Sequence, residues 1–279
     1  MQHDSRLLVR QFDVKRVRAG GSERVIDTIA AEEPLEIRVQ YWFKDAPLTQ
    51  SLAVTMRTPG ADLELAAGFL VAEGIIHGCR DLHDLRILGA QSSNEILAEL
   101  APNVDFEAWR MSRAGFVSSS CGICGKRSRD AISQDVRRNT EEEFLIARSV
   151  IESLPEQLRE HQAGFEQTGG LHAAALADRD GRIQTAFEDI GRHNALDKLV
   201  GWCLLNDRFP LSDHVLFMSS RSSFELIQKA AMAGARVLAT VGGPSSLAVE
   251  AARDYGITLV GFVRDSRFNI YSGDWRVRV

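Results

Sequence analysis

The sequence predicts an α/β fold: a mostly parallel sheet with flanking helices, plus a smaller α+β lobe at the amino terminus. Three short apolar runs, residues 215–218, 236–241 and 257–262, are typical of buried strands. Two helix-forming segments of similar length, 219–235 and 242–256, lie between them. Because strand and helix alternate, right-handed crossovers and parallel neighbouring strands are expected.

The amino-terminal lobe contains shorter elements. Residues 35–43 and 51–57 are expected to form two strands joined by a turn. Apolar residues at helical spacing follow, so a helix with Asp62 as its N-cap is expected. Residues 85–89 and 95–100 are then expected to pair as a hairpin.

The middle of the chain leads into the second lobe. Residues 147–162 favour a helix and residues 171–177 favour a strand. Residues 183–205 predict a strand, a loop and an amphipathic helix. The expected division of the chain is an α+β lobe, a connecting segment with two cysteines, and an α/β lobe: 1–110, 111–140 and 141–279.

The two helices of the carboxyl-terminal lobe carry capping residues. Ser222 with Glu225 three residues later matches a capping box, and Gly234 is placed to end that helix. The next helix is expected to open at Pro244 and to close at Gly256.

Composition limits the classes of function. The chain has 279 residues, of which 44% are hydrophobic and 25% charged, enough for one large or two smaller globular domains. Its net charge of −5 argues against general nucleic-acid binding, which needs an excess of Lys and Arg. No apolar run predicts a signal peptide or a membrane-spanning helix. With four cysteines, no disulfide scaffold is expected, and the expected compartment is the reducing cytoplasm.

Two of the four cysteines are expected to be reactive. Cys203 lies on an apolar helical stripe and Cys79 has no special context, so both are interpreted as packing residues. Cys121 and Cys124 form a C-x-x-C motif in SSSCGICGKRS, where serines and glycines allow motion and cations follow. Three chemistries use such a pair: metal binding, dithiol–disulfide exchange, and sulfur relay through a persulfide.

The residues around this motif leave the three chemistries open. A closed zinc site needs four ligands, whereas one C-x-x-C is present and His172 would supply only a third ligand. Dithiol exchange fits the spacing, although the serines and glycines favour a loop. Sulfur relay needs a thiolate, which Lys126 and Arg127 would stabilise, and is slightly preferred.

An anionic ligand is expected at the carboxyl edge of the predicted parallel strands, where open α/β sheets bind ligands. Three loops, 219–223, 242–246 and 263–268, would meet there. They supply glycines, hydroxyl groups and cations: Arg221, Ser222, Gly242, Gly243, Arg264 and Arg267. Each loop alone is explained by turns and helix caps. The three loops together favour a nucleotide or pyrophosphate site. Since neither a Walker loop nor G-x-G-x-x-G is present, an ordinary ATPase or dinucleotide dehydrogenase is disfavoured.

Two histidines are further candidates for the site. His193 stands beside Glu188, Asp189 and Arg192, where a capping role and a polar site wall fit the sequence equally well. His172 follows two glycines among apolar residues, so it is either a satisfied core histidine or part of a reactive pocket.

Five motifs occur in this order along the chain: SSSCGICGK, GGLHAAAL, FEDIGRHNALDKLVG, SSRSSFELIQKAAMAGA and TLVGFVRDSRFNIYS. Together they resemble those of the formate dehydrogenase accessory sulfurtransferases, the FdhD-type family. The resemblance extends into the amino-terminal lobe through EEPLEIRV and DLELAAGFLVAEGII, so it covers nearly the whole chain.

This resemblance implies a sulfur relay. A cysteine desulfurase would load Cys121 with sulfur as a persulfide, with Cys124 as its partner. The sulfur would pass to the metal of a bis(molybdopterin guanine dinucleotide) molybdenum cofactor, bound as cargo, to give the sulfido ligand that formate dehydrogenase needs. GDP would mimic the nucleotide part of this cofactor. The family's cofactor segment falls on six residues here: Phe262, Val263, Arg264, Asp265, Ser266 and Arg267.

The resemblance also implies partners and a fold. The expected partners are a cysteine desulfurase, the catalytic subunit of formate dehydrogenase and a second copy in a homodimer. The family's fold is cytidine-deaminase-like, but deaminase chemistry is not expected because His172-Ala-Ala lacks the glutamate of the deaminase motif. The assignment of Gly242 and Gly243 to the nucleotide rests on strand-end geometry rather than on the resemblance. A cofactor-binding chaperone without relay and a dithiol oxidoreductase are the alternatives.

Overall fold

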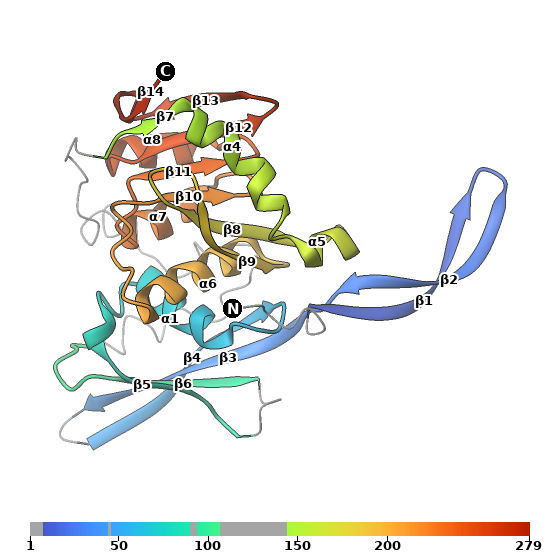
Figure 1. Cartoon of the computed structure of the whole chain (residues 1–279). Coiled ribbons are helices and arrows are strands. Elements are labelled where there is room, and N and C mark those ends of the chain that lie inside the picture. Colours follow the sequence, from blue (N-terminus) through green and yellow to red (C-terminus); the bar gives the residue numbers. More distant parts are fainter. Residues whose placement is uncertain (1–7, 44–45, 90–93, 107–143) are drawn as a thin grey trace.

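The structure is a computed structural model that describes residues 8–43, 46–89, 94–106 and 144–279. Two sheets lie at opposite ends of the body, with helices between them, and a long hairpin projects to one side (Figure 1). None of the helices in these described ranges has both the length and the apolar character needed to cross a membrane.

The amino-terminal lobe is built on a four-stranded sheet with the order β4-β3-β6-β5. Its strands are β3 (Glu33–Phe43), β4 (Ala46–Arg57), β5 (Leu82–Ile87) and β6 (Glu95–Leu100), and a short 3-10 turn, η2 (Cys79–Asp81), precedes β5. The predicted β3–β4 and β5–β6 hairpins are confirmed, and β3 pairs with β6 in parallel. Alternate residues of β3, from Leu35 to Tyr41, are buried, as expected of a sheet with one covered face.

The helix of this lobe, α1 (Asp62–Ala72), begins at Asp62, the residue that was expected to be its N-cap. Its N-cap is Ala61, in a left-handed conformation, and no side chain caps the helix. The predicted N-cap Asp62 is wrong because its carboxylate accepts two hydrogen bonds of 2.9 Å from the guanidinium of Arg57. Arg57 is buried, so this ion pair competes successfully with capping.

The carboxyl-terminal lobe is built on a six-stranded sheet with the order β13-β12-β11-β10-β8-β9. The strands are β8 (His172–Ala177), β9 (Ile183–Asp189), β10 (Val215–Met218), β11 (Val237–Thr240), β12 (Thr258–Arg264) and β13 (Arg267–Ser272). The predicted parallel pairing holds for β10, β11 and β12.

The sheet as a whole is mixed rather than mostly parallel, because the outer pairings are antiparallel. Short connections force the antiparallel pairing of β8 with β9 and of β12 with β13, since a parallel pair needs a crossover of a dozen or more residues. Asp265 and Ser266 make the two-residue turn from β12 to β13, and both have positive φ, 51° and 56°. Such a pair of positive φ angles is what a tight hairpin turn requires.

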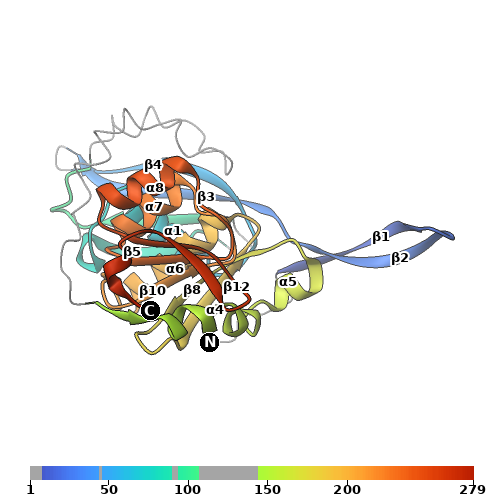
Figure 2. The same ribbon diagram turned by 90° about the horizontal axis from the view of Figure 1, so that it is seen from above.

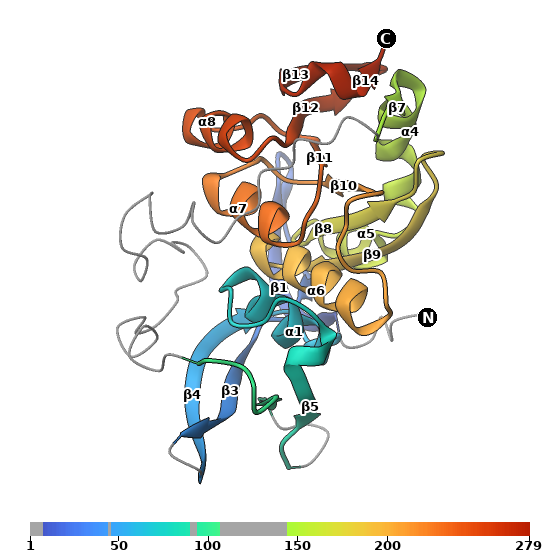
Figure 3. The ribbon, with the colours of Figure 1, turned by 90° about the vertical axis from the view of Figure 1, so that its left-hand side faces the viewer.

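Helices cover both faces of this sheet. One face carries α6 (Arg192–Leu205), α7 (Phe224–Met232) and α8 (Ser246–Asp254), and the other carries α4 (Arg148–Arg159), as Figure 3 shows. The short helix α5 (Ala163–Thr168) lies beside the projecting hairpin. The chain ends in a 3-10 turn, η3 (Asp274–Arg276), and in β14 (Val277–Arg278), which pairs with β7 (Ile146–Ala147).

Strand residues alternate between two hydrophobic clusters. Leu216, Met218 and Leu238 point into a cluster with α6, α7 and α8, whereas Val215 and Phe217 point into a second cluster with α4. The first cluster also contains the core of the amino-terminal lobe, so the two lobes share one hydrophobic core.

The helix caps of the second lobe differ in part from the prediction. The capping box at Ser222 is wrong: α7 starts at Phe224, and the hydroxyl of Ser222 lies 3.0 Å from that of Thr240 instead. For α8 the cap is Ser245, whose hydroxyl accepts from the backbone of Ala248, and Pro244 lies before the helix. Both predicted end glycines are confirmed by positive φ, 74° at Gly234 and 69° at Gly256.

The projecting hairpin was not predicted from the sequence. It consists of β1 (Val9–Arg18) and β2 (Gly21–Ala30), paired in full antiparallel register. Figure 2 shows that it extends well beyond the body of the molecule. We refer to residues 9–30 as the arm.

Candidate functional site

Three loops at the carboxyl ends of β10, β11 and β12 are joined by hydrogen bonds. The amide of Gly242 donates to the carbonyl of Ser220 at 3.1 Å, and the amide of Phe262 donates to the carbonyl of Gly242 at 3.2 Å. The buried hydroxyl of Thr240 lies 2.9 Å from the carbonyl oxygen of Gly242 and 3.0 Å from the hydroxyl of Ser222. The three loops therefore converge as the strand order predicts. The ligand that they would bind stays a prediction.

The Gly242–Gly243 pair is explained by close packing within these loops. A Cβ at Gly242 would lie 2.6 Å from Cγ of Arg221 and 3.0 Å from its Cα. A Cβ at Gly243 would lie 2.5 Å from the ring of Phe262. Glycine at both positions lets the loop after β11 lie against its two neighbours.

The FVRDSR segment divides between core and surface. Val263 is buried in the cluster under α4, so it packs rather than binds. Phe262 has a φ of 56° and is 38% exposed, and the guanidinium of Arg264 lies 5.9 Å from the centre of its ring. Asp265 and Ser266 form the exposed turn to β13, which starts at Arg267.

His172 lies at the same edge, at the start of β8. Burial lowers the pKa of His172, and the positive groups of Arg192, His193 and Arg221 lower it further. His172 begins β8, and Arg192, His193 and Arg221 follow the ends of β9 and β10, so these four residues lie at one edge of the sheet, and we call them the cationic cluster. The charges of Arg192 and Arg221 at this edge suit the anionic ligand expected there.

His193 is held by its neighbours on α7. Its Nε2 lies 2.9 Å from Oε2 of Glu225 and 3.4 Å from the hydroxyl of Ser223. The glutamate that the sequence suggested for a capping box thus pairs with a site histidine.

A buried ion pair fixes the backbone between β9 and α6. The ammonium of Lys198 lies 2.7 Å from Oδ2 of Asp189, and both side chains are nearly inaccessible to solvent. Asp189 also accepts from the amides of Thr58 and Gly191, and Lys198 donates to the carbonyl of Thr58 at 2.7 Å. This network joins the end of β4 to the start of α6, so it sets the position of the cationic cluster relative to the amino-terminal lobe.

The neighbouring carboxylate, Glu188, has a structural role as well. It accepts hydrogen bonds of 2.8 Å from the amides of Gly164 and Phe165 at the start of α5. Burial raises the pKa of Glu188, although the two hydrogen bonds act to lower it. Neither Glu188 nor Asp189 is part of an open polar wall.

The four cysteines fall into different regions. Cys121 and Cys124 lie outside the described residues, so their chemistry is a prediction from the sequence. Cys203 is fully buried, and burial raises the pKa of its thiol to about 12, which confirms its role as a packing residue. Cys79 is exposed rather than packed. In the part of the chain that the structure describes, no three His, Cys, Asp or Glu side chains are grouped to hold a metal ion.

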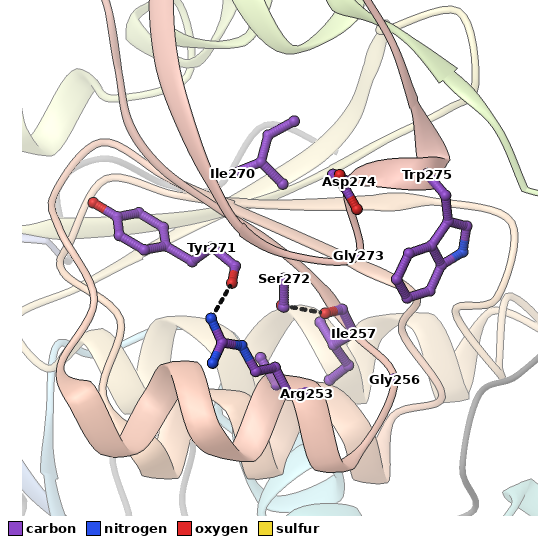
Figure 4. A pocket seen from close by; sticks show the side chains of 10 residues that line it. Arg253, Gly256, Ile257, Ile270, Tyr271, Ser272, Gly273, Asp274 and Trp275 are labelled. Atoms are coloured by element: carbon purple, nitrogen blue, oxygen red, sulfur yellow. Dashed lines mark hydrogen bonds between the residues drawn. The ribbon is translucent and has the colours of Figure 1, made fainter.

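A hollow of about 470 Å³ lies at the opposite edge of the sheet, near the start of β12 (Figure 4). Arg253 of α8, Tyr271 of β13 and Trp275 of η3 line it. None of the predicted site residues contributes to it, so it is separate from the three loops and the cationic cluster.

Comparisons with known proteins agree with the motifs. A family model described as FdhD/NarQ family matches residues 30–278. A protein from Streptomyces coelicolor named sulfur carrier protein FdhD is 46% identical over 95% of this chain and 94% of its own length. A protein of the same name from Saccharolobus solfataricus is 36% identical over 96% of this chain and 98% of its own.

The fold is also found among solved structures. The crystal structure of a candidate formate dehydrogenase accessory protein from Desulfotalea psychrophila matches with a TM-score of 0.75 and 22% identity. The match covers 97% of this chain and all of that one. The family match spans both lobes and includes all predicted site residues, so this chain belongs to the FdhD/NarQ family.

Proposed function

We propose that this chain is a sulfur carrier needed for formate dehydrogenase activity. The observation that carries the proposal is its 46% identity, over nearly its whole length, to a protein named sulfur carrier protein FdhD. The arrangement of the described site is compatible with it, because the joined loops and the cationic cluster form one polar edge suited to a phosphorylated ligand.

Cys121 is proposed to carry the sulfur. Its thiolate attacks the terminal sulfur of a persulfide on a cysteine desulfurase, the sulfur–sulfur bond of the donor breaks, and the donor cysteine leaves as a thiolate. Cys121 then holds a persulfide, and Cys124 assists its discharge. Nearby cations in the sequence, Lys126 and Arg127, favour the thiolate that this step needs.

The acceptor is proposed to be the molybdenum of a bis(molybdopterin guanine dinucleotide) cofactor, bound as cargo. The terminal sulfur passes to the metal, Cys121 leaves as a thiolate, and the metal supplies the two electrons that convert sulfane sulfur to sulfide. The phosphates of the cofactor would bind at Arg221, Arg264 and Arg267. The phenyl ring of Phe262 would stack on a flat part of the cofactor.

The two histidines are proposed to shape this site. Because the pKa of His172 is lowered, its ring is neutral at pH 7 and accepts or donates a hydrogen bond without adding charge. His193, held by Glu225, is a positioning residue for the start of α7. Partners in the proposed cycle are the desulfurase, the catalytic subunit of formate dehydrogenase and a second copy in a homodimer, all in the cytoplasm.

Sulfur loading provides the test of the relay. The purified protein is incubated with a cysteine desulfurase and cysteine, and its intact mass is measured. A single addition of about 32 Da that maps to Cys121 supports a persulfide. Cys79→Ala is the matched control, since this exposed thiol should not contribute. Loss of two protons would instead indicate a dithiol oxidoreductase, and an unchanged mass would refute the relay.

Nucleotide binding provides a second, separate test. GDP binding is measured by calorimetry for the unmodified chain, for Arg264→Gln, and for Arg253→Gln at the opposite edge of the sheet. Weakening by about tenfold in the first variant alone supports phosphate binding at the proposed edge. Normal GDP binding together with no sulfur addition would favour a cofactor-binding chaperone without relay. Equal affinity in all three proteins would refute the assigned location.

A further inference from the structure

The hollow at the opposite edge of the sheet has the size and the mixed lining of a small-molecule site. Its volume of about 470 Å³ falls in the range typical of such sites, and apolar and polar residues share its walls. Figure 4 shows that it lies between the end of α8, the end of β13 and η3. Because it takes no part in the proposed function, a ligand bound there would be a second one.

Hydrogen bonds fix the walls of this hollow. The hydroxyl of Ser272 donates to the carbonyl of Ile257 at 2.6 Å and accepts from the amide of Leu259 at 3.2 Å. The carbonyl of Gly273 accepts a bond of 2.8 Å from the hydroxyl of Thr258. With a φ of 67°, Gly273 turns the chain sharply into η3, which forms one rim. The hollow is therefore preformed by the fold.

Two opposite charges line the hollow without pairing with each other. The guanidinium of Arg253 donates one bond, of 3.4 Å, to the carbonyl of Tyr271 (Figure 4). Among the residues that the structure describes, no carboxylate forms an ion pair with Arg253, and no donor is bonded to the carboxylate of Asp274. Both charged side chains are exposed, so each is available to a ligand.

An indole ring forms the third wall. Trp275 is 56% exposed, and the buried guanidinium of Arg276 lies 5.2 Å from the centre of its ring. Arg276 also donates to the carbonyl of Gly256 at 2.9 Å, so one face of the indole rests on a fixed group. The opposite face is left for a planar ligand, and Ile257 and Ile270 add apolar surface.

The two charges decide which class of ligand fits. An anion would be attracted by Arg253 and repelled by Asp274, and a cation would meet the reverse. We propose that the hollow binds a free α-amino acid with an aromatic side chain. Its carboxylate pairs with Arg253, its ammonium group pairs with Asp274, and its ring stacks on Trp275. This inference goes beyond the proposed function and does not depend on it.

Titration with L-phenylalanine tests the site directly. Binding to the unmodified chain is followed by the NMR signals of the indole N–H groups. The chain has four tryptophans, so the Trp275→Phe variant identifies the signal that belongs to the hollow. This signal should shift with a dissociation constant of about 1 mM, as expected for a ligand of this size. The other three indole signals should stay in place.

Matched ligands separate the two charge pairs. Phenylalaninamide lacks the carboxylate, and hydrocinnamate lacks the ammonium group. Arg253→Gln should weaken the binding of L-phenylalanine about tenfold and leave that of phenylalaninamide unchanged. Asp274→Asn should weaken the binding of L-phenylalanine about tenfold and leave that of hydrocinnamate unchanged.

Controls keep the test decisive. Arg278→Gln removes an exposed arginine that does not line the hollow, so it should leave the affinity for L-phenylalanine unchanged. GDP binding and sulfur loading, measured on the same samples, test the proposed function separately. The inference is overturned if the Trp275 signal does not shift at about ten times the expected dissociation constant. It is also overturned if hydrocinnamate binds as tightly as L-phenylalanine, or if Arg253→Gln weakens phenylalaninamide equally.

Discussion

Replacement of Gly68 by alanine tests the closest contact between the two lobes. Helices α1 and α6 cross there with their backbones in contact. A Cβ at Gly68 would lie 1.9 Å from the carbonyl oxygen of Asp197, and a Cβ at Gly201 would lie 1.8 Å from that of Glu64. Because these neighbours are backbone atoms, they cannot rotate away as a side chain can. The two helices therefore have to separate.

The size of the separation sets the size of the effect. Ordinary van der Waals contact begins at 3.4 Å, so a clash at 1.9 Å requires a movement of about 1.5 Å. Overpacking of a core costs about 1–3 kcal/mol, occasionally more, and a backbone shift lies at the upper end. The better helix propensity of alanine returns about 1 kcal/mol. We expect a net loss of about 2 kcal/mol in the free energy of unfolding, or roughly 4–8 °C in melting temperature.

Urea titration followed by tryptophan fluorescence, together with a thermal melt, measures this loss. Gly78→Ala is the matched control, because Gly78 has a φ of −175° and nothing within 4 Å of its added Cβ. The control should change stability by less than about 0.5 kcal/mol. If Gly68→Ala unfolds at the same urea concentration as the control, the close helix crossing is refuted.

Three further predictions concern the site. Asp189→Asn leaves the buried ammonium of Lys198 unpaired, so the free energy of unfolding in urea should fall by about 3–5 kcal/mol, and Lys198→Met in that background should recover part of it. No loss in the single variant would contradict the pairing. Burial lowers the pKa of His172 below its ordinary value of 6.5, so the linked stability is present above pH 6.5 and lost as the pH falls through the lower folded pKa. His172→Gln should flatten this pH dependence, and an NMR titration at or above 6.5 would refute the shift. Gly243→Ala pushes on the ring of Phe262, which is able to turn aside, so stability should change by less than about 1 kcal/mol while GDP binding measured by calorimetry weakens about tenfold. Unchanged affinity would separate this glycine from the ligand site.

Much of the second lobe was predictable because its strands are short, apolar and bounded by glycine and serine. Residues 215–218 form β10 as expected, and the helices that follow β10 and β11 force parallel pairing. The position of β13 was missed because RFNIYS has no clean alternation, and its pairing depends on the left-handed turn at Asp265 and Ser266. The arm was missed because its mixture of charged and apolar residues lacks a covered face.

Helix caps show where local rules fail. Ser222 and Glu225 have the spacing of a capping box, but each finds a stronger partner in the folded chain. The hydroxyl of Ser222 bonds to Thr240 on the next strand, and the carboxylate of Glu225 bonds to His193 on another helix. Both partners are distant in sequence, so the competition was not visible from the motif.

Pairing between residues distant in sequence also explains which site features were predictable. Strand order alone places the loops that carry Arg221, Gly242 and Arg264 at one edge, and the structure joins them by hydrogen bonds. The role of Asp189 was not predictable, since its amide partner Thr58 is 131 residues earlier in the chain. Pattern predicts the place of a site, whereas long-range pairing decides which polar residues remain available to a ligand.

The FEDIGRHNALDK motif accordingly has two functions that alternate along a few residues. Asp189 and Lys198 point inward and join α6 to the end of β4. Arg192 and His193 lie between them in sequence, at the same sheet edge as His172. The buried ion pair therefore fixes the start of α6, and with it Arg192 and His193, against the end of β4 in the amino-terminal lobe.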